Sequence, residues 1–336
     1  MSRASFPEAY IGCNATITDK NLCTLETCCL AQSSFLYIPD YAGNLFYTIF
    51  FAFFVLPQLV LGFKYKTWTY MAAVILGLGV EVGGYVGRLE LNDNPFNNDA
   101  FLVYLIMLTI VPVFLTAAIY VCLSRIIILY GEHLSPIKAR TVAISFMCSD
   151  FLSLVLQAAG GAVAETADDG SDEQQTGTDI MIAGLLLQAI SLCVFAAAWA
   201  FFQLRVLKGP TDQRPDRVAT RSRTLFKAFQ CGLLLSTVLI IIRSIYRVIE
   251  LWGGFSGDLW NDEVDFMVLD GAMISLSVVI MTALHPGPAF KEQWVESSWS
   301  NKSKHDDNGI ELSQRAGTSV ARGKSFEDED DQSRRD

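Results

Sequence analysis

The feature that most constrains this chain is a series of apolar blocks, each about twenty residues long. A helix of about twenty residues, rising ~1.5 Å per residue, is long enough to cross ~30 Å of hydrocarbon. Hydrophobic residues make up 51% of the 336-residue chain and charged residues only 18%, which is more apolar than an ordinary soluble domain. The blocks therefore predict transmembrane helices rather than the core of a water-soluble protein.

Seven such blocks follow one another, and we expect each to cross the membrane once. They cover residues 45–63, 68–87, 101–128, 141–163, 180–204, 229–249 and 264–284. The predicted fold is all-α: a polytopic membrane protein with a seven-transmembrane-helix bundle at residues 44–290. A Cys-containing segment at 1–43 precedes the bundle, and a polar, Ser-rich tail at 291–336 follows it. We expect no cleavable signal, because residues 1–40 contain no apolar core.

Lysine and arginine predict the orientation, because cytosolic loops of membrane proteins carry an excess of both. The first, third and fifth loops and the tail are basic, whereas the second loop offers only Arg88 and the fourth and sixth offer neither residue. We therefore expect the N-terminus outside the cytosol and the C-terminus inside. The protein should be integral to the plasma membrane, with an endomembrane as the alternative; its oligomeric state is left open.

Four of the eight cysteines lie in the segment that is predicted to be outside: Cys13, Cys23, Cys28 and Cys29. An oxidising compartment permits disulfides, and four cysteines allow three pairings. Asn14, in the sequence Asn14-Ala15-Thr16, is a glycosylation acceptor on the same side. We therefore expect disulfide bonds among these cysteines and a glycan on Asn14.

Polar residues lie inside the predicted spans, where ionisable groups are costly and face the bundle interior. Counting ~1.5 Å per residue from the predicted outer ends puts five groups from five helices at a depth of roughly 9–12 Å; they are Glu81, Gln157, Gln188, Arg243 and Asp270. Arg243 and Asp270 lie on consecutive antiparallel spans, so we expect an ion pair. Arg247 follows one turn after Arg243, and Glu250 is its local partner.

The second span has two distinct faces. Glu81, Tyr85 and Arg88 recur at i, i+4 and i+7 and so share one face of the helix. The other face carries a small-xxx-small pattern that permits close approach of a neighbouring helix; its residues are Gly79, Gly83 and Gly87.

In the fourth span, Asp150 shares a face with Ser153 and Gln157, and its carboxylate would suit a cationic headgroup or a proton. All these in-span groups have two interpretations. They form either a buried network that fixes helix register or a substrate or ion site.

Several chemistries are not supported by the sequence. The three histidines, His133, His285 and His305, are too scattered for a three-histidine zinc site. Gly323-Lys324-Ser325 lacks the glycine spacing and the preceding strand of a phosphate-binding loop. We therefore expect no metal, no cofactor, no enzyme activity and no ATP coupling. The net charge of −10 also argues against a nucleic-acid partner.

The in-span motifs together resemble the fungal lipid-translocating exporter family, also called the RTA-like or resistance-to-aminocholesterol family. The resemblance extends from about Tyr37 to Phe290. It rests on an ordered set of motifs: Glu81-Val-Gly-Gly-Tyr85-Val-Gly-Arg88, Pro112 to Tyr120 with Ser124-Arg125, Asp150 through Gln157 to Gly160-Gly161, Gly184 to Gln188, Arg243-Ser-Ile-Tyr246-Arg247-Val-Ile-Glu250, Asp270, and His285-Pro286-Gly287.

The resemblance implies a seven-span protein linked to release of sphingoid bases, resistance to amphipathic toxicants or porphyrin uptake. The leading hypothesis is a transporter or floppase-like exporter of amphipathic lipids or small molecules, facilitated or proton-coupled. In this hypothesis Glu81, Asp150 and Asp270 contact a cationic amine, and Arg88, Arg243 and Arg247 pair these acids or bind an anionic group. The alternative is a seven-helix sensor or regulator that affects lipid export indirectly.

Overall fold

The computed structural model describes residues 23, 28–30, 33, 35–135, 138–167, 171–208, 214–253, 257, 259–291 and 293–297. Within these residues, seven helices are long and apolar enough to cross a membrane. Six are α1 (Tyr41–Tyr65), α2 (Trp68–Asp93), α3 (Asn98–Tyr130), α4 (Ala139–Thr166), α5 (Asp172–Lys208) and α7 (Thr224–Trp252). The seventh joins α8 (Glu263–Phe266), the π-helical η5 (Met267–Ala272), α9 (Met273–Ala283) and α10 (Pro286–Phe290). Each predicted span lies within one of these helices, which confirms the all-α, seven-helix prediction.

The helices are longer than the predicted spans because polar residues begin and end them. The Asp40 side chain accepts the N–H of Gly43 at 2.6 Å where α1 begins, and Asn97 accepts that of Ala100 at 3.2 Å where α3 begins. α5 begins at Asp172, eight residues before the predicted span, with acidic side chains that favour a helix N-terminus. Hydropathy alone does not detect such polar turns.

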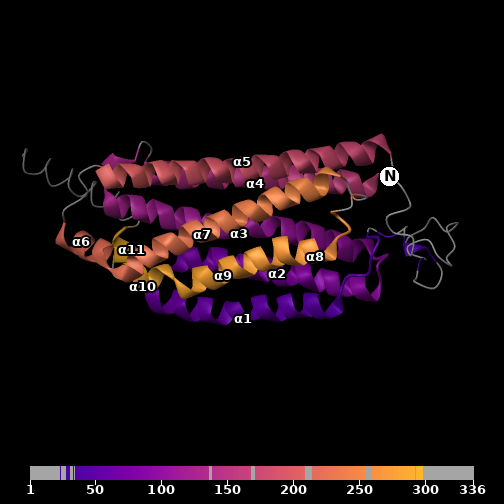
Figure 1. Cartoon of the computed structure of the whole chain (residues 1–336), viewed down its shortest axis with the longest axis horizontal. Helices are drawn as coiled ribbons and strands as arrows, with labels where there is room; N and C mark the ends of the chain where they lie inside the picture. Colours follow the sequence, from indigo (N-terminus) through magenta and orange to yellow (C-terminus); the bar gives the residue numbers. More distant parts are fainter. Residues whose placement is uncertain are drawn as a thin grey trace, which may run out of the picture.

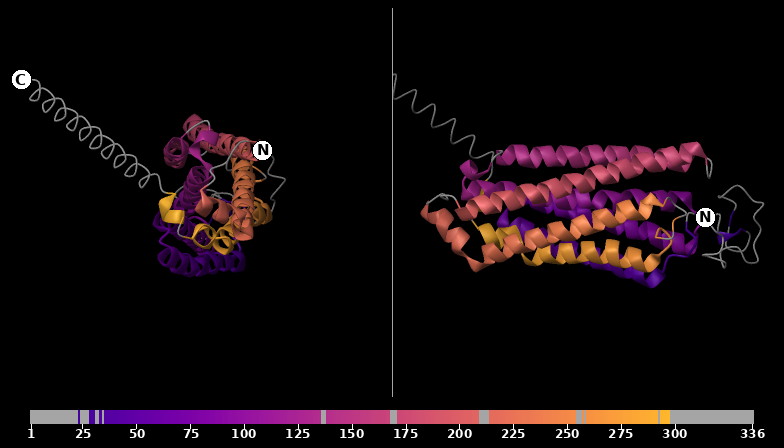
Figure 2. Two further views of the ribbon diagram at one scale, coloured as in Figure 1. Left: turned by 90° about the vertical axis from the view of Figure 1, so that its left-hand side faces the viewer. Right: turned by 45° about the horizontal axis from the view of Figure 1, so that its top comes forward.

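The helices lie side by side along the long axis, with α4 and α5 at one edge of the bundle and α1 at the opposite edge (Figure 1). The left view of Figure 2 looks along this bundle. In the most apolar window of each helix, 56% of α3 is buried against 17% of α1. α3 is therefore the central helix, on which the polar side chains of its neighbours converge.

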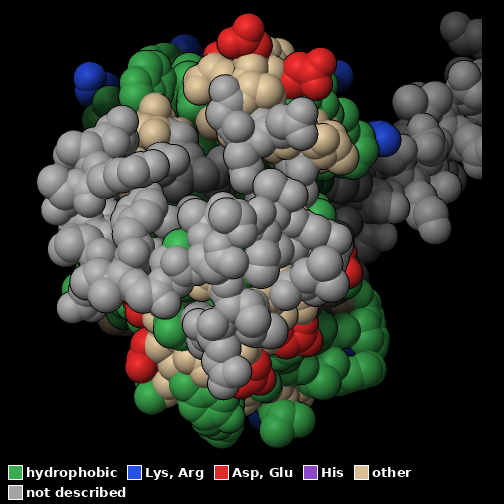
Figure 3. All heavy atoms as spheres, turned by 90° about the vertical axis from the view of Figure 1, so that its right-hand side faces the viewer, with side chains coloured by type: hydrophobic (Ala, Val, Ile, Leu, Met, Phe, Trp, Pro, Cys, Tyr) green, Lys and Arg blue, Asp and Glu red, His purple; other side chains and the backbone are tan. Residues whose placement is uncertain are grey.

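The two ends of the bundle differ in charge. The α8 end carries acidic first turns on α3, α5 and α8, and acidic side chains are visible around this end in Figure 3. The opposite α10 end holds α6 (Pro215–Ser222), α10 and α11 (Gln293–Glu296) (Figure 1). α6 lies in the basic fifth loop and was not expected as a helix. The α10 end is the one that we predict to face the cytosol.

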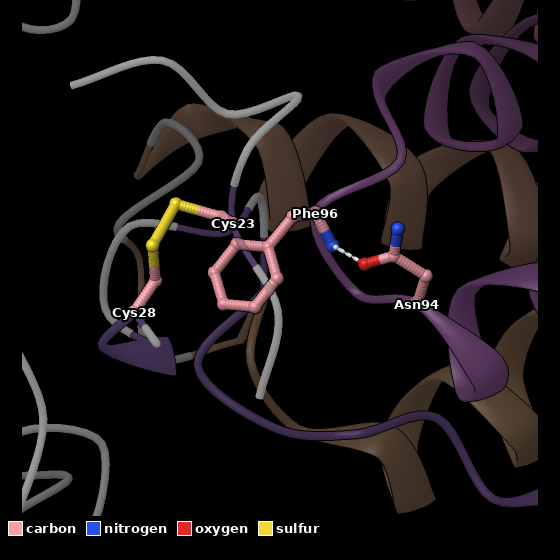
Figure 4. The surroundings of a disulfide bond; sticks show 4 residues. All are labelled: Cys23, Cys28, Asn94 and Phe96. Atoms are coloured by element: carbon pink, nitrogen blue, oxygen red, sulfur yellow. Dashed lines mark hydrogen bonds between the residues drawn. A yellow bond between two sulfur atoms is a disulfide. The ribbon is translucent and has the colours of Figure 1, made fainter. Parts of the chain in front are cut away.

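A disulfide joins Cys23 to Cys28 at the α8 end and packs against Phe96 of the α2–α3 connection (Figure 4). The Phe96 N–H donates to the Asn94 side chain at 3.2 Å, which holds this connection. Cys29 is also disulfide-bonded. Cys13 and the predicted glycosylation acceptor Asn14 lie outside the described residues.

Glycines bring α2 against α3, but not all of those that the sequence indicated. A Cβ on Gly87 would lie 3.0 Å from the Ala100 carbonyl oxygen, and one on Gly83 would collide with Met107. Gly79 is exposed, and a Cβ there would meet nothing within 4 Å. The expected packing role of Gly79 is therefore wrong within this chain, because positions four apart drift by ~40° around a helix with 3.6 residues per turn, and Gly79 falls outside the face that meets α3.

The closest backbone contact is between α4 and α5. A Cβ on Gly160 would lie 2.6 Å from the Gly177 carbonyl oxygen, and one on Gly177 would lie 2.8 Å from that of Gly160. A Cβ on Gly184 would lie 2.9 Å from the Ser153 carbonyl oxygen. Because backbone atoms cannot rotate out of the way, this pair of helices tolerates no side chain at these positions.

Replacing Gly177 by alanine should lower the melting temperature of the purified protein in detergent, because overpacking costs about 1–3 kcal/mol. Gly79→Ala is the matched control, and its open position should leave the melting temperature unchanged or slightly raised. Equal melting temperatures for the two variants would contradict the α4–α5 contact.

Candidate functional site

The centre of the site is an ion pair between α7 and the seventh span. Arg243 Nε lies 2.7 Å from Asp270 Oδ1, and the side chains are 1% and 0% exposed. Arg243 also donates to the Leu108 carbonyl oxygen of α3. The structure thus forms the pair that the sequence predicted, and it fixes α7 to two other helices.

A π-helical turn presents Asp270 to this pair. Residues 267–272 form η5, and π-helical turns inside α-helices occur frequently at functional sites. The next residue, Gly271, allows two aromatic side chains to approach, because a Cβ there would lie 2.7 Å from the Tyr85 hydroxyl and the Tyr47 ring. The turn therefore aims the carboxylate inward at a point where the backbone is closely covered.

Arg247 lies one turn beyond Arg243 and extends the cluster. Its Nη1 lies 2.7 Å from Glu250 Oε2, and its Nε lies 3.8 Å from Asp270 Oδ1. The Tyr246 hydroxyl donates to the other Glu250 oxygen at 3.4 Å. Asp270 therefore faces two arginines, which offsets the repulsion between the like charges of Arg243 and Arg247.

Arg88 of α2 forms a separate part of the site toward the α8 end. Its guanidinium lies 4.0 Å from the Phe266 ring centroid, a cation–π contact. Its Nε donates to Asn44 at 2.9 Å, and its Nη2 lies 3.2 Å from Glu263 Oε1. Arg88 is fully buried, and Glu263 is the carboxylate that pairs it.

Aromatic residues cover Arg88 at the α8 end. Phe35 and Trp260 stack with ring centroids 5.6 Å apart, and Tyr37 accepts a hydrogen bond from Arg88 at 3.0 Å. Burial raises the pKa of Tyr37 to about 12, so this residue stays a neutral phenol at physiological pH. The segment before α1 thus closes this end over the guanidinium.

Glu81 is the unpaired acid of the site. It is 1% exposed, and among the residues that the structure describes neither of its carboxylate oxygens has a hydrogen-bond partner. Asp270, Arg243 and Arg247 lie within electrostatic range of it. A buried carboxylate without a hydrogen-bond donor is costly, so a proton or a further cation would stabilise it.

Asp150 lies apart from the arginines, between α3 and α4. Thr116 and Tyr120 of α3 each donate to its Oδ2 at 2.9 Å. It is 1% exposed and has no cationic partner among the residues that the structure describes. Two hydroxyl donors stabilise a carboxylate in part and leave it able to take a cation or a proton.

Gln157 and Gln188 pair with each other rather than with the arginines. The Gln157 amide donates to Gln188 Oε1 at 3.0 Å and to Ser153 Oγ at 2.6 Å. Ser153 in turn donates to the Gly184 carbonyl oxygen at 2.9 Å. The predicted layer of five groups is therefore two: Glu81, Arg243 and Asp270 lie together, and the glutamines join α4 to α5.

Sequence analysis missed three residues of the Arg88 site. Asn44 and Glu263 each fall one residue outside a predicted span, at 45–63 and 264–284. Phe266 lies one turn before Asp270 inside a predicted span, where an apolar side chain gives no sign of contact with a guanidinium. A search for polar residues flanking each span would have found the first two.

The charged side chains of the site do not balance one another. Among the described residues, no group of three His, Cys, Asp or Glu side chains is placed to hold a metal ion. The arginine cluster, defined as Arg88, Arg243 and Arg247 with Glu81, Glu250, Glu263 and Asp270, contains four acids and three bases. One carboxyl group is thus left over, and it is Glu81.

Neutralising either partner of the Arg243–Asp270 pair should destabilise the protein by about 3–5 kcal/mol, because the other charge stays buried. Arg243→Gln with Asp270→Asn should cost less than the sum of the single changes, with a coupling of ~0.5–3 kcal/mol. Thermal unfolding in detergent measures the cycle. Neutral substitutions are preferable, because an arginine at position 270 would lie beside Arg247.

The matched control is Arg247→Gln with Asp270→Asn, whose atoms are 3.8 Å apart and whose coupling should be smaller. Strictly additive losses at Arg243 and Asp270 would mean that the two side chains do not stabilise each other.

Comparison with known proteins identifies relatives in yeast. The chain is 30% identical over 291 residues to the sphingoid long-chain base transporter RSB1 of Saccharomyces cerevisiae (strain Lalvin EC1118), covering 78% of this chain and 76% of that one. It is 29% identical to protoporphyrin uptake protein 1 of S. cerevisiae, covering 60% and 64%. Protein RTA1 of the same species is 28% identical, covering 63% and 64%. No solved structure matches the chain.

The family model for RTA1-like proteins matches residues 74–293, which include α3 to α7 and the whole arginine cluster. Together with seven membrane-spanning helices and relatives named as transporters, this match defines an integral membrane protein. The chain belongs to the RTA1-like family.

Proposed function

We propose that this protein moves amphipathic lipids or lipid-like toxicants with a cationic headgroup, such as sphingoid bases or sterol-like amines, across the membrane. The relative that covers 78% of the chain is named for a sphingoid long-chain base, a molecule with an amine on a hydrocarbon chain. The observation that carries the proposal is Glu81. Its buried carboxyl group lacks a partner in a cluster that otherwise balances its charges.

At Glu81, the ammonium group of the substrate and a proton would compete for the same carboxylate. A bound ammonium neutralises the carboxylate, and a proton arriving at the same oxygen atoms removes the attraction and releases the amine. Asp150, held by two hydroxyl groups, would act in the same way nearer the α10 end. Transport is therefore proposed to be facilitated or proton-coupled and not driven by ATP, in the plasma membrane or an endomembrane.

A test uses purified protein in liposomes and a fluorescent sphingoid base. Wild type should speed its movement across the bilayer relative to protein-free liposomes, and Glu81→Gln should slow it at least tenfold. Glu81→Gln should not lower the melting temperature, because the lost carboxyl group has no partner in the cluster. Glu90→Gln, an exposed glutamate on the same helix, is the matched control. Equal rates with and without protein would reject the proposal.

The alternative is a seven-helix sensor that signals through its tail. Removing the tail tests it, provided that the cut leaves the contacts of the bundle intact. Trp294 is 1% exposed and lies under the Arg125 guanidinium, 3.8 Å from its ring centroid. Phe290 packs on Trp294 at 5.4 Å. A chain cut at Lys291 would lose these contacts, so the cut belongs after Ser297.

A chain ending at Ser297 should move the labelled base at the wild-type rate if the bundle is the transporter. A sensor that signals through the tail would lose its cellular effect in the same variant. Lipid efflux from cells that express each form distinguishes the two. Loss of flux in liposomes with the chain ending at Ser297 would contradict a bundle-only transporter.

A further inference from the structure

A crevice opens sideways between α3 and α4, toward the surrounding lipid. It is lined by apolar side chains of both helices, with Met181 of α5 behind them, and a water-sized molecule can reach about 20 Å³ of it. Ile106 is 38% exposed and Ala158 is exposed at its mouth. This volume is far below that of a ligand pocket (~300–1,000 Å³), so the side chains at the mouth must move apart to admit a larger molecule. What lies outside a transmembrane helix at this depth is hydrocarbon.

The floor of the crevice carries one polar atom without a partner. Gln157 lines it, is 4% exposed, and donates two hydrogen bonds through its amide nitrogen. Its carbonyl oxygen Oε1 is buried and unbonded. An unbonded buried acceptor is costly and favours a ligand that brings a donor, such as an ammonium or a hydroxyl group.

Three side chains separate this crevice from the arginine cluster. Leu105, Thr109 and Met181 line it on one side and line a second, smaller hollow on the other, of which a water-sized molecule can reach about 10 Å³. Arg247 and Glu250 form part of the wall of that second hollow. The partition is one side chain thick, and none of its three side chains is charged. The Thr109 hydroxyl donates to the Leu105 carbonyl oxygen of its own helix.

Glu250 links the second hollow to a third one, at the α8 end of the bundle. It lines this open hollow beside the end of α7, of about 680 Å³ including its mouth, together with Gly253 and Gly257. Neighbouring hollows thus share lining residues from the lipid-facing side to the open end, and charged side chains line them only beyond the partition.

We infer that the crevice between α3 and α4 is the lateral entrance for a single-chain cationic amphiphile, whose headgroup passes Gln157 and the Leu105–Thr109–Met181 partition to enter the arginine cluster beside the Arg247–Glu250 pair. The occupant follows from the chemistry of the walls: hydrocarbon outside, one hydrogen-bond acceptor at the floor, and a carboxylate beyond. This inference rests on the proposed function and names the route to the same cluster.

The entrance is tested with a C18 sphingoid base that carries a diazirine in its chain and a terminal alkyne. Full-length protein in liposomes is irradiated with the probe, and labelled peptides are mapped by mass spectrometry. Labels should fall on residues 105–110 and 154–161, and excess unlabelled base should compete with them. Ala158→Trp should lower this competed labelling and the flux at least fivefold, because an indole fills the mouth.

Ala159→Trp is the matched control, since the neighbouring alanine is equally exposed and does not line the crevice. It should keep both labelling and flux, and both variants should keep the wild-type melting temperature. Competed labels elsewhere, or equal effects of the two tryptophans, would overturn the entrance. If the protein moves the base but the competed labels lie elsewhere, the entrance is rejected and the proposed transport stands. If the labels lie in the crevice but the protein moves no base, the entrance is supported and the transport is rejected.

Discussion

Asp270 lies between Arg243 and Arg247 in a part of the bundle from which water is excluded, and much of the architecture follows from the need to neutralise these charges. Because lipid offers no compensation, each charged side chain must find its partner on another helix or on its own next turn. This requirement holds α7 against the seventh span and against the Leu108 carbonyl of α3. The π-helical turn at η5 is the local departure that brings Asp270 to this position.

Around that pair, the bundle separates two ways of holding helices together. α4 and α5 meet through glycines and a short ladder of amides and hydroxyls. The arginine cluster joins α1, α2, α7 and the seventh span through ion pairs and aromatic rings. The seam between α3 and α4 belongs to neither type in its half nearer the α8 end, and the crevice lies there. A route along that seam would avoid both the glycine contacts and the ion pairs.

Much of this could be predicted from the sequence, and the failures have physical causes. The Arg243–Asp270 pair followed from matching depth on antiparallel neighbours, since one-dimensional counting suffices when two helices are adjacent in the chain. The same counting placed Gln157 and Gln188 in one layer with Asp270, because depth says nothing of the angle around the bundle axis. Glu263 and Asn44 were missed because hydropathy ends a span at its first polar residues, which is where Arg88 finds its partners.

The sequence by itself determined the number of helices, their order and the polar residues that face inward, because hydrocarbon tolerates only long apolar helices and penalises every unpaired charge. It also determined the family, through motifs that recur in a fixed order. Only the tertiary structure decided which inward-facing groups meet. Contact between helices depends on rotation and tilt, which follow from side-chain packing such as Gly160 against Gly177. Packing therefore decided that Glu81 has no partner and that Arg88 does, although both lie on one face of α2.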